Sequence, residues 1–199
     1  MPTLIALVIA LFAGAAHAQE AGDAAAGKAV FEAQCVSCHG QGGASLVPAN
    51  PILSAQHVEY LREQTAAYRD GGRKNAVMAG MAKTLTDQQI ADIAQYLAEQ
   101  PAVIVGAADT DAAALGERLY RGGSIERGLP ACTACHGAAG AGVAGLAPRL
   151  SGQHTDYTIA ALKAYLSGER DNAQMAAIAA QLTEEEMTQL AEFIAGLSY

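Results

Sequence analysis

The feature that most constrains the fold of this chain is an internal repeat, in which the second half reproduces the first at an offset of 97 residues. At this offset Cys35-Val-Ser-Cys38-His39-Gly40 aligns with Cys132-Thr-Ala-Cys135-His136-Gly137. The register then continues without a gap through Pro51 and Pro148, Gln56-His57 and Gln153-His154, Tyr60 and Tyr157, Arg73 and Arg170, Asn75 and Asn172, Met78 and Met175, and Leu85-Thr86 and Leu182-Thr183. Such a long register indicates duplication of a folding unit.

The apolar residues of each half recur at helical spacing, and no segment shows the alternation of apolar and polar residues that is typical of a strand. Capping boxes of Thr86 with Gln89 and of Thr183 with Glu186 predict where the last helix of each half begins. The other expected helices span residues 23–33 and 56–68 in the first half, and 111–120 and 153–165 in the second. We therefore predict an all-α protein of two tandem domains, over residues 19–103 and 104–199.

The two halves differ upstream of the cysteines, where Gly27 matches Gly116 at an offset of 89 residues. The second half thus holds eight extra residues within 121–131, a stretch rich in glycine that predicts a surface loop. The join between the halves lies near Pro101. Because three adjacent aliphatic side chains follow it, we expect this linker to pack between the domains.

The N-terminal segment predicts export from the cytoplasm. A short apolar run ends in Ala16-His17-Ala18, which is typical of a signal peptide over residues 1–18 with cleavage after Ala18. No Lys or Arg precedes the run, an unusual feature for such a segment. We expect a periplasmic protein.

The net charge of −8 disfavours nucleic acid as a partner, because a phosphate backbone repels an acidic chain. The charge favours solubility and steering toward a basic docking patch. Two domains this small also have thin cores, so each needs an additional stabilising element.

Both cysteine pairs belong to Cys-x-x-Cys-His motifs, the attachment pattern of c-type haem. On one helical turn the two thiols can reach two vinyl groups of one porphyrin, while the adjacent imidazole binds the iron. A redox dithiol would require a βαβ context, and a zinc site would have to gather ligands from separate halves. We therefore predict two covalently bound haem c groups, held by Cys35, Cys38 and His39 and by Cys132, Cys135 and His136.

The second axial ligand of each iron is predicted from the repeat. Met78 and Met175 each lie 39 residues beyond their histidine, whereas Met81 corresponds to Ile178 and is expected to be a core side chain against the porphyrin. The repeated His57 and His154 are the alternative ligands. In the other interpretation these two histidines bond locally or to a haem propionate.

These motifs resemble those of the dihaem cytochrome c4 family, whose members consist of two class I cytochrome c domains. The resemblance implies that the carbonyls of Pro51 and Pro148 accept a hydrogen bond from the histidine ligands. It also implies close crossings of the first and last helices at Gly27 and Gly116, with Tyr96 and Phe193 beside them. Candidates to bind propionates are Arg73, Arg170, Gln56 and Gln153, although the arginines could equally lie on a solvated face.

The expected function is electron transfer by a monomeric carrier, not an enzyme, between a membrane quinol-oxidising complex and a terminal oxidase or reductase. Peripheral association with the membrane is compatible with this prediction. The alternative is a dihaem subunit of a larger enzyme, such as a flavocytochrome that oxidises sulfide. Haem peroxidase chemistry is disfavoured, because both irons have two protein ligands in this prediction.

Overall fold

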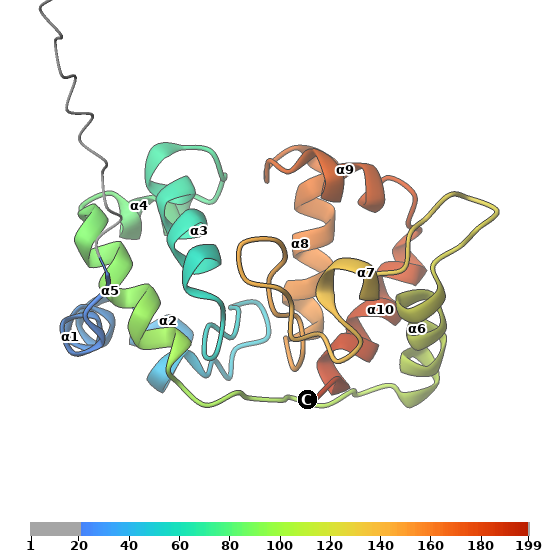
Figure 1. Cartoon of the computed structure of the whole chain (residues 1–199), viewed down its shortest axis with the longest axis horizontal. Coiled ribbons are helices and arrows are strands. Elements are labelled where there is room, and N and C mark those ends of the chain that lie inside the picture. Colours follow the sequence, from blue (N-terminus) through green and yellow to red (C-terminus); the bar gives the residue numbers. More distant parts are fainter. Residues whose placement is uncertain (1–20, 199) are drawn as a thin grey trace, which may run out of the picture.

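A computed structural model describes residues 21–198, so the predicted signal peptide lies outside the described residues. Two helical domains lie side by side, and no β-strand occurs within the described range (Figure 1). The predicted all-α fold is therefore confirmed. Helices of the first domain are α1 (Ala24–Gln34), α2 (Val36–His39), α3 (Val58–Asp70), α4 (Ala76–Ala82) and α5 (Asp87–Ala98), with a 3₁₀ turn at Gln41–Gly43. Those of the second are α6 (Thr110–Gly122), α7 (Thr133–His136), α8 (Thr155–Ser167), α9 (Ala173–Ala179) and α10 (Glu184–Gly196).

In each domain the first and last helices cross in direct backbone contact. A Cβ atom added at Gly27 would lie 1.9 Å from the carbonyl oxygen of Asp92, and one at Gly116 would lie 1.9 Å from that of Gln189. Any side chain at either position would thus force α1 away from α5, or α6 away from α10. The expected glycine crossings are confirmed.

Aromatic side chains fill the space beside these crossings. The rings of Phe31 and Tyr96 lie 5.7 Å apart, and those of Tyr120 and Phe193 lie 5.2 Å apart, both in tilted geometry. Phe31 and Tyr120 are fully buried, so each pair forms the centre of a small core.

Both predicted capping boxes are present. The hydroxyls of Thr86 and Thr183 accept hydrogen bonds from the backbone N–H groups of Gln89 and Glu186, whose side chains accept in turn from the threonine backbone. These reciprocal bonds satisfy two donors that a helix start otherwise leaves free, and so they determine where α5 and α10 begin.

The short helices α4 and α9 were not predicted. Each is only seven residues long and starts at an asparagine N-cap, Asn75 or Asn172. The asparagine side chain accepts a hydrogen bond from the backbone N–H of Met78 at 2.9 Å or of Met175 at 2.8 Å. The Asn-x-x-Met pattern was visible in the sequence, but so short a helix has no apolar periodicity to reveal it.

The linker between α5 and α6 runs along the outside of the molecule and docks on the second domain (Figure 1). The backbone N–H of Gly106 donates to Ala195 at 2.9 Å, and the backbone of Gly152 lies against Val103 and Ile104. About two fifths of the surface of Ile104 and Val105 stays exposed. The linker is ordered by packing, as expected, but its place is the outer surface of the second domain and not the gap between domains.

No helix within residues 21–198 combines the length and apolar character that crossing a membrane requires.

Candidate functional site

The two attachment motifs occupy single helical turns. In α2 the backbone N–H of His39 donates to Cys35 at 3.0 Å, and in α7 that of His136 donates to Cys132 at 2.9 Å. A glycine at positive φ, Gly40 or Gly137, ends each turn. The turn places both thiols and the imidazole on one short segment, and the four thiols form no disulfide in the described part of the chain.

Each histidine of the motifs is held by a carbonyl twelve residues further on. His39 Nδ1 lies 3.1 Å from the oxygen of Pro51, and His136 Nδ1 lies 2.9 Å from that of Pro148. A carbonyl can only accept, so Nδ1 carries the proton and Nε2 keeps its lone pair. Burial lowers the pKa of both imidazoles, an effect that these hydrogen bonds oppose. The result is a neutral, oriented imidazole, the form that binds a metal.

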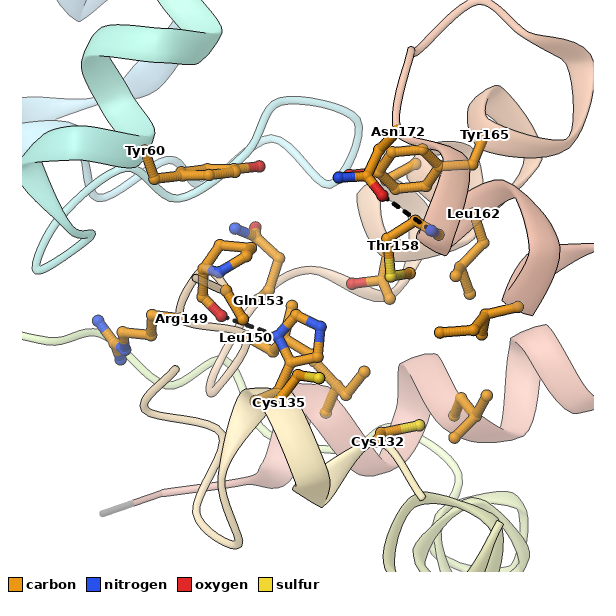
Figure 2. Close-up of a pocket in the computed structure, with 18 of the residues that line it drawn as sticks. Tyr60, Cys132, Cys135, Arg149, Leu150, Gln153, Thr158, Leu162, Tyr165 and Asn172 are labelled. Carbon is orange, nitrogen blue, oxygen red and sulfur yellow. Dashed lines mark hydrogen bonds between the residues drawn. The ribbon is translucent and has the colours of Figure 1, made fainter. Parts of the chain in front are cut away.

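A cavity of about 320 Å³ opens above α7 in the second domain (Figure 2). It brings together Cys132, Cys135, His136 and Met175, which sequence analysis assigned to one haem. Before a haem is attached, burial raises the pKa of the Cys132 thiol to about 11. Other lining residues are mostly apolar and include Pro148, Leu150, Ala161, Leu162, Ile178, Leu182, Leu190 and Ile194. The lining suits a flat apolar macrocycle, so the residues present fit a haem.

The first domain also contributes to this cavity. Ile52, Gln56 and Tyr60 reach its wall from across the domain boundary. Tyr60 lies opposite the second domain's side chains in Figure 2. The site of the second domain is therefore completed by the first.

Met81 lies on α4, and 40% of its surface is free of contact with other protein atoms. The expectation that this side chain packs against the porphyrin stays a prediction. Its counterpart Ile178 lines the cavity of the second domain.

The repeated histidines bond across the domain boundary. His57 Nε2 lies 3.0 Å from the carbonyl oxygen of Ala141, and His154 Nε2 lies 2.8 Å from that of Ser45. Each Nε2 is thus the donor of an interdomain hydrogen bond and has no free lone pair for a metal. These interdomain bonds differ from the expected local ones, and they occupy the Nε2 atoms that a histidine–iron alternative would use.

The two repeated glutamines also form hydrogen bonds across the domain boundary, through their side-chain amides. Gln56 accepts from the backbone N–H of Arg149 and donates to its carbonyl, both at 2.9 Å, and Gln153 makes the equivalent pair with Ile52. Each amide nitrogen keeps a second N–H, and both glutamines line the cavity, so propionate binding by them stays a prediction.

Arg73 and Arg170 also link the domains. Arg73 donates to the hydroxyl of Tyr157, and Arg170 donates to that of Tyr60, with the guanidinium of Arg170 stacked 4.5 Å from the Tyr165 ring. Arg170 is buried and lines the cavity, so the solvated-face interpretation is wrong for it, while propionate binding stays a prediction.

Arg149 is an interface residue that sequence reasoning missed. Its buried guanidinium donates to the carbonyl of Ser54 at 3.1 Å, to that of Val103 at 3.3 Å and to the Ser151 hydroxyl at 2.9 Å. It thereby connects the first domain, the linker and the second domain. The repeat gave no signal, because the corresponding residue of the first half is Ile52.

Comparison with known proteins agrees with this architecture. The sequence model of the cytochrome c family matches the chain twice, over residues 24–101 and 113–198. A cytochrome c4 from Thiocapsa roseopersicina is 43% identical over 188 residues, which cover 92% of this chain and 97% of the relative. A thiosulfate dehydrogenase electron acceptor from Thiomonas intermedia is 41% identical over 139 residues, which cover 67% of this chain and 63% of the relative.

A solved structure has the same arrangement. The crystal structure of reduced recombinant cytochrome c4 from Pseudomonas stutzeri matches with a TM-score of 0.83 and 37% identity, over 89% of this chain and all of the other. The chain therefore belongs to the cytochrome c family, and with two such domains, each carrying a covalently attached haem c, it is a dihaem electron-transfer protein of the cytochrome c4 kind.

Proposed function

We propose that this protein works in the periplasm as a monomeric carrier between a membrane quinol-oxidising complex and a terminal oxidase or reductase. Cys35 and Cys38 hold one haem, and Cys132 and Cys135 hold the other. His39 and Met78 would hold the iron of the first haem, and His136 and Met175 would hold that of the second. The observation that carries this proposal is the cavity in which Cys132, Cys135, His136 and Met175 converge.

The protein's own residues prepare each site for electron transfer. Each haem, when bound, supplies an iron that gains or loses one electron. Pro51 and Pro148 orient the histidine ligands through Nδ1, and the asparagine caps hold the start of α4 and α9 beside the methionines. The apolar lining excludes water from the second site and, with a thioether ligand, raises its reduction potential.

A second candidate is a dihaem redox subunit that accepts electrons directly from a sulfur-oxidising dehydrogenase. It is favoured by the relative from Thiomonas intermedia, whose name is thiosulfate dehydrogenase electron acceptor. Stable co-purification with a dehydrogenase or flavoprotein would support this candidate, whereas a carrier should purify alone.

The number of haems tests the attachment sites. After expression with a haem-maturation system, the mass of the protein should exceed that of the mature chain by two haems. The double change Cys132→Ala and Cys135→Ala should remove one of them, because each thioether needs its own cysteine. A wild-type protein with a single haem would contradict the proposal.

A spectrum tests the methionine ligands. Ferric haem with a thioether ligand has a weak far-red sulfur-to-iron charge-transfer band. Met78→His combined with Met175→His should abolish this band, and Met81→Leu should leave it nearly intact. Loss of the band in Met81→Leu would transfer the ligand role in the first domain to Met81.

A further inference from the structure

The two domains differ in how the chain enters the attachment motif. In the first domain α1 ends at Gln34 and Cys35 follows at once, whereas residues 123–131 separate the end of α6 from Cys132 in the second. This loop extends along the outer side of the second domain, away from the first (Figure 1). It is therefore a feature of only one of the two haem sites.

The two limbs of the loop are fixed against each other and lead into the cavity. Ser124 and Leu129 exchange two backbone hydrogen bonds, both at 2.9 Å, and the Leu129 side chain is buried. A Cβ atom added at Gly123 would collide with the carbonyl of Leu129, so the limbs are in contact. Pro130 then lines the cavity. A thioether at Cys132 would attach the end of this ordered loop to the haem.

The loop carries Arg127, which bonds the turn that follows the methionine helix α9. Its two terminal nitrogens donate to the two carboxylate oxygens of Glu186 at 3.0 and 2.7 Å, and one of them also donates to the carbonyl of Gln181 at 3.1 Å. Hydrogen bonds from Arg127 lower the pKa of the Glu186 carboxyl, so the pair is charged at neutral pH. A bidentate pair with a third bond fixes geometry better than a single surface contact does.

The turn that Arg127 bonds belongs to the methionine side of the cavity. It covers residues 180–183 and comes directly after α9, the helix that holds Met175. Ile178 and Leu182, on either side of the bonded carbonyl, both line the cavity. Arg127 thus connects the segment that leads into the cysteines with the segment that leads out of the methionine helix.

The first domain holds the corresponding turn differently. Arg69, at the end of α3, donates to the carbonyl of Leu85 at 3.2 Å and to the carboxylate of Asp87 at 2.7 Å. The counterpart of Arg69 in the second half is Leu166, which is 55% exposed and has no group that could donate such bonds. An arginine therefore bonds this turn in both domains, but only in the second does it come from the loop before the cysteines.

We propose that Arg127 is a positioning residue for the Met175 ligand, which it holds by bonding the turn after α9 to the loop that leads into Cys132. The inference rests on the proposed function, since Met175 as an iron ligand is part of that proposal. Departure of the thioether from the iron requires this segment to open locally, and the Arg127 bonds oppose the opening. Loss of Arg127 should therefore weaken ligation at the second haem and not at the first.

The probe is imidazole, which competes with a thioether for ferric haem. In the dihaem protein with Met78→His, the far-red sulfur-to-iron band arises from the second haem alone, so its loss on titration measures displacement of Met175. Arg127→Gln in this background should raise the apparent affinity for imidazole about fivefold. In the Met175→His background, where the band reports the first haem, Arg127→Gln should have no effect. An unchanged affinity at the second haem, or an equal change at both haems, would overturn the proposal.

Two further variants separate the Arg127 bonds from a general effect of charge. Glu186→Gln introduces the residue of the first half, Gln89, and so retains the capping box but loses the ion pair. It should match Arg127→Gln, and the two changes together should add little. Arg69→Gln removes an arginine from the corresponding turn of the first domain and should leave the second haem unaffected. An effect of Arg127→Gln that Glu186→Gln does not reproduce would refute the proposed role.

The starting spectra distinguish this proposal from the proposed function. If Met78→His alone abolishes the far-red band, Met175 is not a ligand and the ligand assignment of the second haem fails with the role of Arg127. If the band persists in Met78→His and Arg127→Gln leaves the imidazole affinity unchanged, the ligand assignment stands and only the role of Arg127 is wrong.

Discussion

At the scale of single residues, the two helix crossings tolerate the least change, because the backbones of the crossing helices leave no room for a side chain at Gly27 or Gly116. A Cβ at Gly27 would meet the backbone of Asp92 at 1.9 Å, and a backbone atom cannot rotate away as a side chain can. The contact distance alone therefore requires glycine, and no larger residue, at position 27.

We predict that Gly27→Ala or Gly116→Ala destabilises the holoprotein by about 1–3 kcal/mol, as overpacking of a tight contact does. The measurement is chemical unfolding followed by circular dichroism. Gly122→Ala is the matched control, because Gly122 lies in α6 with no atom within 4 Å of an added Cβ. Equal stability of Gly27→Ala and the control would mean that the helices do not touch there.

At the scale of elements, the short methionine helices depend on their caps. A helix of seven residues contributes few internal hydrogen bonds, so the cap bond is a large part of what orders its first turn. Asn75 and Asn172 hold the backbone of the methionine itself.

Replacement of a cap should therefore affect both stability and ligation. Asn75→Ala is expected to cost about 0.5–2 kcal/mol and to weaken the far-red band, because Met78 loses its support. Asn75→Asp retains an accepting oxygen and should restore most of both. An Asn75→Ala protein with an unchanged band and unchanged stability would show that the cap is dispensable.

At the scale of the whole molecule, the pairing of the domains follows from the repeat. Gln56 and Gln153 bond the backbone of the opposite domain in equivalent ways, as do His57 and His154. Duplicated side chains thus form an interface with approximate twofold symmetry. Such buried polar bonds fix one relative orientation of the domains.

Loss of a glutamine should loosen this interface. Gln56→Leu leaves two backbone groups of Arg149 without partners, at a cost of about 1–3 kcal/mol for each group that stays buried. Unfolding of the intact holoprotein measures this loss. Gln189→Leu is the control, since that amide bonds Glu185 at the surface. A similar stability of both variants would contradict the role of the interface.

Redox titration should resolve two one-electron steps in the intact protein, both in the range of histidine–methionine haems. Oxidation of one haem adds positive charge near the other and makes its oxidation harder, an effect that salt screens. Each half expressed alone should therefore differ in potential from the intact protein at low salt. Unchanged potentials would indicate two independent domains.

The sequence by itself determined the all-helical class, the duplication, the attachment motifs and the starts of α5 and α10. These features depend on local spacing and on caps between residues a few positions apart, as with Thr86 and Gln89. Only the tertiary structure decided what His57, Gln56 and Arg149 bond and where Met81 lies. Their partners are distant in the sequence, as Gln56 and Arg149 show, and polar side chains bond whatever groups folding brings to them.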